Sequence, residues 1–393
     1  MTTTEERVLL ASDEPFVRRL CPHLREPYDG PPVRRIVTPA GDHAWLVSRY
    51  AEIKGLLRDD RLGRSHPDPG RKPQYAGNPT YDLATAADHG AGDKFHHDLR
   101  KVLQPHFAAR HMLHLRPKVE ELTAGLVEAF AARPRPADLH AGLSAPLTLL
   151  VICELLGVPV GEREQCAALV SRMGGVADEQ GDGTAAFFGY LRDLAARKRA
   201  APEDDVISRL VTGNDVTDEQ VGEIAMLLLF AGIGSTVKQI DYGFLLLAND
   251  PAQRDAVAAD PDLVPRAVEE MLRVSGSLSL PRYAREDIEI GGVTIGEDEL
   301  VLLDLARANM DVDAFDCPAE FDVGRAPNRH LTFAHGAWAC MGAPLARILM
   351  QVLFTRLLTR LPGLRPLVPA AEVATTDAPL GGGLTDELLV TWY

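Results

Sequence analysis

The pattern of hydrophobic positions predicts a mostly helical chain. Between residues 95 and 275, apolar residues recur about every three or four positions, as on one face of an amphipathic helix. This spacing predicts helices over residues 95–109, 116–132, 143–156, 161–172, 184–199, 218–249 and 263–275. A short helix is expected in "YAEIKGLLRD", and an apolar helical pattern returns in "ARILMQVLFTRLLTRL" near the C-terminus.

Strands are predicted only near the two ends of the chain. "RRIVTPAGDHAWLVSRY" favours two strands around the turn "PAGDH", and "DIEIGGVTIGEDELVLLDL" (287–305) favours hairpin strands with a Gly-Gly turn. "GGGLTDELLVTWY" ends the chain as a turn and a strand. The expected fold class is mainly α with small β-sheets. No repeat or clear linker divides the chain, so we expect residues 1–393 to form one domain.

Composition and charge exclude several classes of function. Of the 393 residues, 46% are hydrophobic and 25% charged, as in soluble globular proteins. The formal net charge of -15 argues against nonspecific nucleic-acid binding and gives no reason for attraction to an anionic membrane. The N-terminal "MTTTEERVLL" lacks a basic region and a long apolar core, and no run approaches the ~18 apolar residues of a membrane span. We therefore expect a cytoplasmic protein.

Among the five cysteines, the sequence indicates one candidate functional residue and no shared disulfide or metal site. They are odd in number and never form CxxC, so neither a disulfide framework nor a zinc site follows from their spacing. Cys340, however, lies in "LTFAHGAWACMGAPLAR", at the mouth of the last predicted helix. Free N–H groups and the positive end of a helix lower the pKa of a thiol. The resulting thiolate is the form that binds a metal or attacks an electrophile.

The residues around Cys340 leave three interpretations open at this point. Gly336 and Gly342 would allow a positive φ or the close approach of a flat ligand. Cys340 is thus a metal ligand, a nucleophile or a buried cysteine that packs as a small hydrophobe. His330 and His335 are not spaced as a general base for a nucleophile.

A family resemblance decides between them. Phe333, Gly336, Cys340 and Gly342 match the pattern F-x-x-G-x-x-x-C-x-G, and this segment resembles the cysteine-ligand loop of the cytochrome P450 family. The resemblance implies that Cys340 is the axial thiolate ligand of haem b (iron protoporphyrin IX). Such a thiolate donates electron density to the iron and favours cleavage of the O–O bond.

Other segments resemble the same family and follow in the same order. "EEMLR" carries the E-x-x-R pair as Glu270 and Arg273, which alone would read as an ordinary ion pair on a helix. "FDVGR" (321–325) is similar to the segment that supplies a further arginine to this pair, and "ARANMD" departs from the family at Met310. The resemblance covers essentially the whole chain. It implies a roughly triangular helical body, with haem between a long central helix and the cysteine-loop helix.

The resemblance also implies partners for the two haem propionates. "FHHDLRKVL" places His96 and Arg100 four residues apart, as in the family's H-x-x-x-R, and Arg282 and His330 match two further positions. Trp338 is a departure, because the family usually has His or Arg two residues before the cysteine. An indole donates one N–H but carries no charge. Trp338 therefore either replaces an ionic contact by stacking or only packs.

The central helix carries "AGIGST" where the family has A-G-x-[DE]-T-T. Ala231 and Gly232 lack bulk, so we expect the helix to lie against the porphyrin there. Hydroxylating members continue with an acid and an alcohol that deliver protons to dioxygen. Here the acid position is Gly234, and the alcohols are Ser235 and Thr236. Water, a polar group of the substrate, or chemistry without oxygen insertion would each account for the missing acid.

The implied function is that of an oxidoreductase acting on a small natural product with dioxygen and electrons from a separate ferredoxin or flavodoxin. Oxidative coupling or ring closure without oxygen insertion is one alternative, and a haem sensor or carrier without turnover is another. A basic face near Cys340 is expected to receive an acidic redox partner, and its candidate residues are Arg100, Lys101, Arg329 and Arg347.

The substrate is expected to lie among four segments, residues 62–94, 172–190, 228–236 and 276–281. The first of these is rich in Pro, Gly, Asp and His, and so long a connection is usually functional or disordered. Four aromatic residues in or beside these segments either contact an aromatic ligand or pack, namely Tyr75, Tyr81, Phe187 and Phe188.

Overall fold

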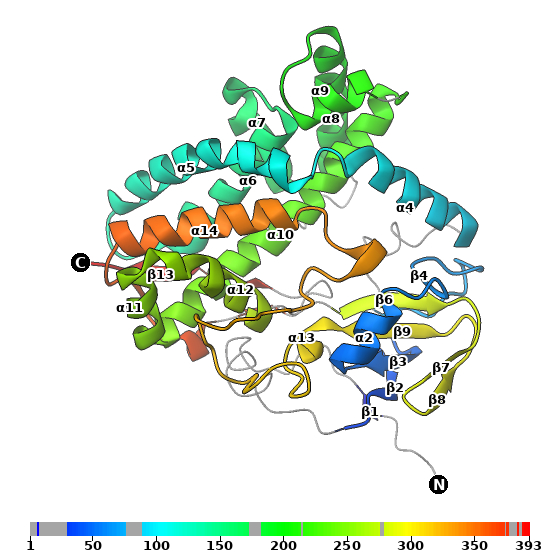
Figure 1. The fold of residues 1–393 in the computed structure, drawn as a ribbon. Helices are drawn as coiled ribbons and strands as arrows, with labels where there is room; N and C mark the ends of the chain where they lie inside the picture. The colour runs from blue at the N-terminus through cyan, green and yellow to red at the C-terminus, as the bar shows by residue number, and fades with distance from the viewer. Residues whose placement is uncertain are drawn as a thin grey trace.

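The fold is mainly helical, as the hydrophobic pattern predicts (Figure 1). A computed structural model of the chain describes residues 6–7, 30–75, 89–172, 182–213, 215–275, 279–373, 375–376, 383–384 and 387–393. The helices are α2 (Tyr50–Leu56), α4 (His89–Leu103), α5 (Ala109–Ala131), α6 (Ala145–Leu156), α7 (Arg163–Arg172), α8 (Asp182–Ala200), α9 (Val206–Gly213), α10 (Asp218–Asn249), α11 (Pro251–Ala259), α12 (Val264–Ser275), α13 (Leu305–Ala308) and α14 (Ala343–Arg360). Shorter helical turns are the π-helix η2 (His140–Ser144) and the 3-10 turns η3 (Val160–Glu162), η5 (Pro261–Leu263), η6 (Gly336–Trp338) and η7 (Ala370–Glu372).

The strands form one larger sheet and three small ones. The larger sheet has the order β1-β2-β3-β9-β6-β4, built from β1 (Glu6–Arg7), β2 (Val33–Val37), β3 (His43–Val47), β9 (Leu300–Asp304), β6 (Ser279–Ala284) and β4 (Leu62–Gly63). The small sheets pair β10 (Arg365–Pro366) with β13 (Leu389–Thr391) and β5 (Ala137–Asp138), β11 (Thr375–Thr376) with β12 (Gly383–Leu384), and β7 (Ile288–Ile290) with β8 (Val293–Ile295). Figure 1 shows the helices on one side of the molecule and the larger sheet on the other.

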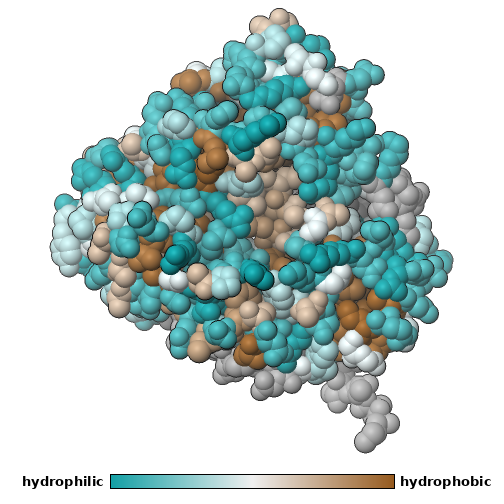
Figure 2. Space-filling view, viewed as in Figure 1, coloured by the Kyte–Doolittle hydropathy of each residue, from teal (hydrophilic) through white to brown (hydrophobic). Residues whose placement is uncertain are grey.

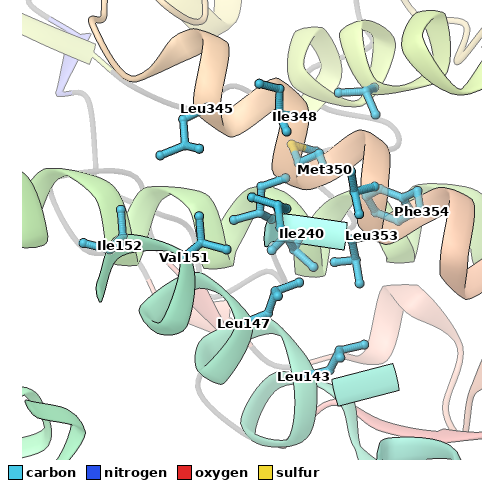
Figure 3. Packing of buried hydrophobic residues seen from close by; sticks show 14 of the residues in the cluster. Leu143, Leu147, Val151, Ile152, Ile240, Leu345, Ile348, Met350, Leu353 and Phe354 are labelled. Atoms are coloured by element: carbon cyan, nitrogen blue, oxygen red, sulfur yellow. The ribbon is translucent and has the colours of Figure 1, made fainter. Parts of the chain in front are cut away.

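The main core lies where three helices meet. Leu147 and Val151 of α6, Ile240 of α10 and Leu353 and Phe354 of α14 are buried and belong to one continuous cluster (Figure 3). A second cluster of buried side chains lies under the sheet and α2. The segment around Cys340 contacts both clusters, since Phe333 and Met341 pack against the first and Ala334 and Trp338 against the second.

Helix α10 is bounded where the sequence predicts. The side-chain oxygen of Thr217 accepts from the N–H of Gln220, and the Gln220 side chain accepts from the N–H of Thr217. This reciprocal capping box starts the helix at Asp218. The prediction that no segment resembles a membrane span was wrong in one respect, because α10 is long and apolar enough to qualify. Its packing against α6, α8 and α12 explains that composition, since a core helix is also apolar.

The other predicted elements are confirmed with shifted ends. The two strands around "PAGDH" are β2 and β3, which pair antiparallel, and the Gly-Gly turn joins β7 to β8. The segment 287–305 also contains β9, which joins the larger sheet instead of the hairpin. Helices α9 and α11 were not predicted, since each is short and amphipathic over only about two turns.

Candidate functional site

The segment that carries Cys340 is a closed loop. The N–H of Cys340 donates to the carbonyl oxygen of Phe333 at 2.8 Å, which ties the two ends of the loop together. Between them, Ala334 and Gly336 have positive φ values of 55° and 62°. The loop ends at α14, whose first turn contains Pro344, so the sulfur lies beside a helix N-terminus as predicted.

The backbone conformation requires glycine at position 336 but not at position 342. A Cβ at Gly336 would lie 3.1 Å from the carbonyl oxygen of Leu57, at the end of α2, in addition to the strain of its positive φ. Gly342 has an ordinary φ of -75°, which excludes a positive φ there, and the close approach of a flat ligand at Gly342 stays a prediction. A Cβ at Gly342 would lie 3.9 Å from the Cys340 sulfur, in ordinary contact.

The thiol of Cys340 is accessible but only partly hydrated. The residue is exposed, yet surrounding protein displaces enough water that burial raises the pKa of the Cys340 thiol. Hydrogen bonds from the backbone N–H groups of Gly342 and Ala343 oppose this rise without overcoming it. The predicted net lowering was therefore wrong for the metal-free thiol. A metal ion would remove the proton outright, and the same N–H groups would then stabilise the thiolate.

Three of the predicted propionate-binding residues contact this loop. Arg100 of α4 donates to the carbonyl oxygen of Ala339 at 2.8 Å. The ring of His96, also on α4, stacks on Trp338 with ring centroids 4.3 Å apart and an interplanar angle of 30°. The guanidinium of Arg282, on β6, lies 4.6 Å from the centroid of the Trp338 ring. The structure thus brings His96, Arg100 and Arg282 together at the loop.

His330 lies differently from the prediction. Its Nε2 is 3.2 Å from a carboxylate oxygen of Glu269, and its Nδ1 accepts from the N–H of Thr332 at 3.3 Å. Both ring nitrogens therefore have protein partners, which leaves neither for a propionate. Glu269 also accepts two hydrogen bonds from Arg347, at 2.6 and 2.8 Å. Arg347 in turn lies over the ring of Phe333 at 4.7 Å, so these residues brace the start of the loop against α12 and α14.

Glu269 is a residue that sequence reasoning missed. Burial raises the pKa of its carboxyl group, but hydrogen bonds from His330 and Arg347 outweigh burial and bring the pKa down to about 2. The available signal was its place beside Glu270 in "EEMLR", one position away on the same helix. Nothing in the local sequence identifies its partners, which come from segments 61 and 78 residues further along the chain.

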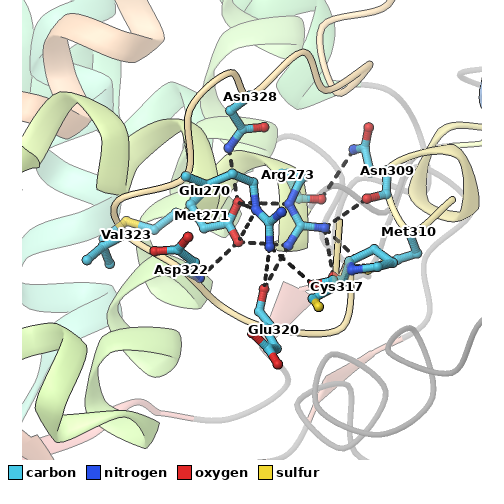
Figure 4. Close-up of polar contacts among 12 residues, drawn as sticks. Glu270, Met271, Arg273, Asn309, Met310, Cys317, Glu320, Asp322, Val323 and Asn328 are labelled. Carbon is cyan, nitrogen blue, oxygen red and sulfur yellow. Dashed lines mark hydrogen bonds and ion pairs between the residues drawn. The ribbon is translucent and has the colours of Figure 1, made fainter. Parts of the chain in front are cut away.

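The predicted E-x-x-R pair is the centre of a buried network (Figure 4). Arg273 donates two hydrogen bonds to the carboxylate of Glu270, at 2.7 and 2.8 Å, and both side chains are fully buried. Arg325, from "FDVGR", lies 3.1 Å from the same carboxylate, which confirms the predicted third member. Asn328 also donates to Glu270 at 3.0 Å.

This network fixes the segment that leads to the cysteine loop. Arg273 donates to the backbone carbonyl oxygens of Asn309, Pro318 and Glu320, at 2.8, 2.9 and 3.0 Å. Met310, where the family has Arg, places its sulfur 3.6 Å from the Arg273 guanidinium. The N–H groups of a guanidinium point in fixed directions, so their acceptors have to lie at fixed positions. These hydrogen bonds therefore fix the backbone between α13 and the cysteine loop.

One stretch of α10 is open, although the C-terminal part of this helix, from Val237 to Leu247, is largely buried. Leu227 and Phe230 are 42% and 50% exposed, and Ala231, Gly234 and Ser235 are also exposed. On the face drawn in Figure 2, apolar surface reaches the centre of the molecule between hydrophilic side chains. A Cβ at Gly234 would contact nothing within 4 Å, so this position borders open space.

Ala231 and Gly232, which were both predicted to lie against the porphyrin, have different surroundings. Ala231 is exposed, as a wall for a flat ligand requires, whereas a Cβ at Gly232 would lie 2.7 Å from the side chain of Ile152 on α6. Gly232 therefore permits close packing of α10 on α6, and its expected contact with a porphyrin stays a prediction. Ser235 donates to the carbonyl oxygen of Ala231 at 2.7 Å, and Thr236 is half-buried next to it.

The aromatic residues named as candidate ligand contacts mostly pack. Phe187 is fully buried and stacks on Tyr190 with ring centroids 6.4 Å apart. Phe188 lies against Gly222 of α10, where a Cβ would be 3.3 Å from its ring. Burial raises the pKa of Tyr75 to about 12. Tyr81 lies outside the described residues, as do parts of the 62–94, 172–190 and 276–281 segments.

The side chains at this site fit a haem. An axial ligand has to be an accessible soft donor, and Cys340 supplies an exposed thiol with N–H groups directed at it. Two propionates need cations, and Arg100 and Arg282 both contact the cysteine loop. A flat macrocycle needs a wall without bulk, and Ala231 lies on the exposed stretch of α10.

Comparisons with known proteins extend over the whole chain. The family model for cytochrome P450 matches residues 192–362. Pentalenolactone synthase of Streptomyces exfoliatus is 36% identical, and the match covers 98% of this chain and 98% of that protein. Mycinamicin IV hydroxylase/epoxidase of Micromonospora griseorubida is also 36% identical, over 92% of each protein.

A solved structure gives the same result. The substrate-free cytochrome P450 PimD, a polyene macrolide antibiotic pimaricin epoxidase, superposes on this chain with a TM-score of 0.89. The two are 44% identical, and the match covers 100% of both chains. Given this extent of likeness and the geometry of the cysteine loop, the chain belongs to the cytochrome P450 family.

Proposed function

We propose that this cytochrome P450 inserts an oxygen atom into a macrolide-type natural product, with Cys340 as the ligand of its haem iron. The chain is a haem-thiolate oxidoreductase of natural-product biosynthesis that uses dioxygen and electrons from a separate redox partner. The observation that carries the residue assignment is the closed loop between Phe333 and Cys340, which presents one accessible thiol at a helix N-terminus.

The haem is proposed to be haem b, with its propionates bound by Arg100, Arg282 and His96. Bound through Cys340, haem supplies the electron transfer that breaks the O–O bond of dioxygen. The three side chains reach the loop from α4 and β6, so the carboxylates would lie near Trp338. Replacing both arginines by Ala is expected to lower haem content, because a carboxylate shielded from water needs a cation. Full haem loading in that double variant would refute this placement.

A macrolide is favoured by the relatives and by the open stretch of α10. PimD is a polyene macrolide antibiotic pimaricin epoxidase, and the related MycG has been solved with mycinamicin V, at 33% identity and a TM-score of 0.87. In this chain Leu227 and Phe230 offer exposed apolar area, and Gly234 leaves space beside them. Such a surface suits a large, mostly apolar substrate that excludes water from the reaction.

The protein's own part in proton delivery is proposed to involve no acidic side chain. The hydroxyl of Ser235 gives its hydrogen to the carbonyl oxygen of Ala231, and its lone pairs remain able to accept. The space beside Gly234 admits a water molecule or a polar group of the substrate, which would donate to Ser235 and pass a proton toward dioxygen. Thr236 is a second hydroxyl next to this path.

The redox partner is proposed to be a ferredoxin or flavodoxin that docks on basic residues near the loop. Arg100 and Arg347 are engaged within the protein, so the exposed Lys101 and Arg329 remain from the predicted set. We add Lys54 and Arg58, which lie near His335 of the loop. Burial is the main cause that lowers the pKa of the His335 imidazole, and the positive charges of Arg58 and Lys54 lower it further. We further propose a cytoplasmic protein without membrane attachment.

A second candidate reaction is oxidative coupling or ring closure without oxygen insertion. The observation that favours it is the departure at Gly234 from the acid that the pattern of hydroxylating members has. Mass spectrometry of the product of a macrolide substrate separates the two reactions. Oxygen insertion adds the mass of one oxygen atom, whereas ring closure removes that of two hydrogen atoms. A macrolide that neither shifts the Soret band nor is converted would refute the proposed substrate class.

A further inference from the structure

Two buried cysteines of neighbouring helices have their sulfur atoms in contact. Cys153 lies on α6 and Cys166 on α7 (Figure 1), and their Sγ atoms are 3.8 Å apart. Both are free cysteines, with 1% and 0% of their surface exposed. Cys317 and Cys340, the other cysteines that the structure describes, are exposed. The Cys153–Cys166 pair therefore stands apart from the site described above.

The backbone between α6 and α7 holds the two sulfur atoms at this distance. The chain turns at Gly157, whose φ of 77° ends α6, and the N–H of Val158 donates to the carbonyl oxygen of Cys153 at 2.8 Å. Arg163, the first residue of α7, pairs with the carboxylate of Glu154 on α6. A disulfide bond is about 2.05 Å long, so closing the gap requires the sulfur atoms to approach by less than about 2 Å. Rotation of the two side chains and a small shift of α7 would close it.

The contact also makes the two thiols chemically unequal. Cys153 donates its S–H to the sulfur of Cys166, and this hydrogen bond holds the pKa of the Cys166 thiol below its ordinary value. The same bond, together with burial, raises the pKa of the Cys153 thiol. A thiolate is the form that attacks a peroxide, and a neighbouring thiol converts the resulting sulfenic acid into a disulfide. Cys166 is thus suited to attack and Cys153 to complete the bond.

Burial decides which oxidant suits the pair. A thiol that water does not contact is shielded from large reagents in the folded protein. Hydrogen peroxide is uncharged and close to water in size, so it can enter through brief local openings of the fold. The dioxygen and electrons that this enzyme uses also form hydrogen peroxide whenever two electrons and two protons reach dioxygen without product formation. The oxidant is therefore available at the protein itself.

We propose that Cys153 and Cys166 form an oxidation site that hydrogen peroxide closes to a disulfide between α6 and α7. The Cys166 sulfur attacks one peroxide oxygen, the O–O bond breaks, and a sulfenic acid and one water molecule form. The Cys153 sulfur then displaces the hydroxyl group as a second water molecule. The two thiols lose two electrons and two protons, which the peroxide gains. A small dithiol reverses the change by thiol–disulfide exchange.

The disulfide would fix α7 on α6 beside the predicted substrate segments. Helix α7 ends at Arg172, where the segment 172–190 begins, and Ile152, next to Cys153, meets Gly232 of α10. A covalent bond between the two helices removes the openings in which α7 separates from α6. We therefore expect the backbone N–H groups of α7 to exchange hydrogen more slowly in the oxidised protein.

The test treats the haem-loaded protein with a small molar excess of hydrogen peroxide and then maps its cysteines. Free thiols are alkylated after denaturation, and tryptic peptides are analysed by mass spectrometry. Trypsin cleaves after Arg163, between the two cysteines, so the disulfide appears as two joined peptides that dithiothreitol separates. We expect these joined peptides, lighter by the mass of two hydrogen atoms than the two thiol peptides together. We also expect slower hydrogen exchange in α7, which dithiothreitol reverses.

Two variants serve as controls. Cys317→Ala removes an exposed cysteine and should leave the joined peptides unchanged, whereas Cys166→Ala should abolish them. The result for wild type is decisive even if Cys166→Ala does not fold. Recovery of Cys153 and Cys166 as free thiols, while Cys317 is oxidised, would overturn the inference. So would sulfinic acid at both positions without a disulfide, or a disulfide from either one to another cysteine. The proposed haem site and substrate do not enter this test.

Discussion

The side-chain hydroxyl of Ser235 donates a 2.7 Å hydrogen bond to the carbonyl oxygen of Ala231, one turn earlier in α10. This bond occupies the only hydrogen of the hydroxyl and leaves its lone pairs to accept. Beside it, Gly234 adds no side chain to the space that it borders. The exposed stretch of the central helix therefore offers a neutral acceptor where the family pattern A-G-x-[DE]-T-T has a carboxylic acid.

The Ser235→Ala variant should lower product formation by about tenfold or less, against the roughly 10²–10⁴-fold cost of removing a positioned acid–base group. Water or substrate near Gly234 would still deliver the proton. Gly234→Asp should not increase product formation, because it places a partly desolvated charge in the open space. Product and hydrogen peroxide are both quantified in single-substrate turnover.

Thr123→Val is the matched control for Ser235→Ala. Thr123 makes the same kind of bond within α5, to the carbonyl oxygen of Val119, and its loss should leave turnover unchanged. A collapse of product in Ser235→Ala, with the electrons diverted to peroxide, would show that the serine is an indispensable relay. The acid-free account of proton delivery would then be wrong.

Gly336→Ala should impair the cysteine loop more than its φ value alone explains. An alanine with positive φ costs about 1–2 kcal/mol, and here the added Cβ would also lie 3.1 Å from the carbonyl oxygen of Leu57. Gly292→Ala is the matched control, since Gly292 has a φ of 80° but open space around it. We expect haem content and thermal stability to fall in Gly336→Ala and only stability to fall, by less, in Gly292→Ala. Equal losses in both would contradict this view of the loop.

Arg273→Lys should destabilise the protein by about 3 kcal/mol or more, because it breaks a buried ion pair that is also hydrogen-bonded. A lysine brings one ammonium group, which cannot reach the carboxylate of Glu270 and three carbonyl oxygens at once. Denaturant unfolding measures the change. Arg254→Lys, at an ion pair with the exposed Asp255, serves as control and should change stability by about 0.5 kcal/mol or less. A similar effect of the two substitutions would contradict the role assigned to the buried network.

The contact of Glu269 with His330 and Arg347 predicts a dependence of stability on acid pH. The pKa of Glu269 is about 2 in the folded protein against an ordinary value of 4.5, so its contribution is present above pH 4.5 and lost as the pH falls toward 2. Glu269→Gln should therefore lower the free energy of unfolding near pH 6, by at most about 3 kcal/mol, and have progressively less effect below pH 4.5. A difference that stays constant from pH 6 to pH 3 would refute this assignment.

Features set by local rules could be predicted from the sequence. The bounds of α10 follow from its apolar spacing, and Thr217 with Gln220 caps it at the expected place. The Glu270–Arg273–Arg325 network was predicted because its members lie in short, ordered motifs. These features depend on residues close together in the chain or on patterns shared by the family.

Features set by tertiary packing could not be predicted. Gly232 turns toward Ile152 because successive residues of a helix point about 100° apart, and only the position of α6 decides which one meets a neighbour. Glu269, which faces Nε2 of His330, belongs to α12, and the desolvation that raises the pKa of the Cys340 thiol comes from the folded surroundings. The stacking of Trp338 on His96 and Arg282 likewise requires three segments to meet.

The spectrum of the reduced protein with carbon monoxide tests the central assignment most directly. Wild type and Cys340→Ala are compared, with Cys317→Ala as control because Cys317 is also an exposed free cysteine. We predict the red-shifted Soret band of thiolate ligation in wild type and Cys317→Ala, and its loss in Cys340→Ala. Retention of that band in Cys340→Ala, or its absence from the haem-loaded wild type, would contradict Cys340 as the ligand of the haem iron.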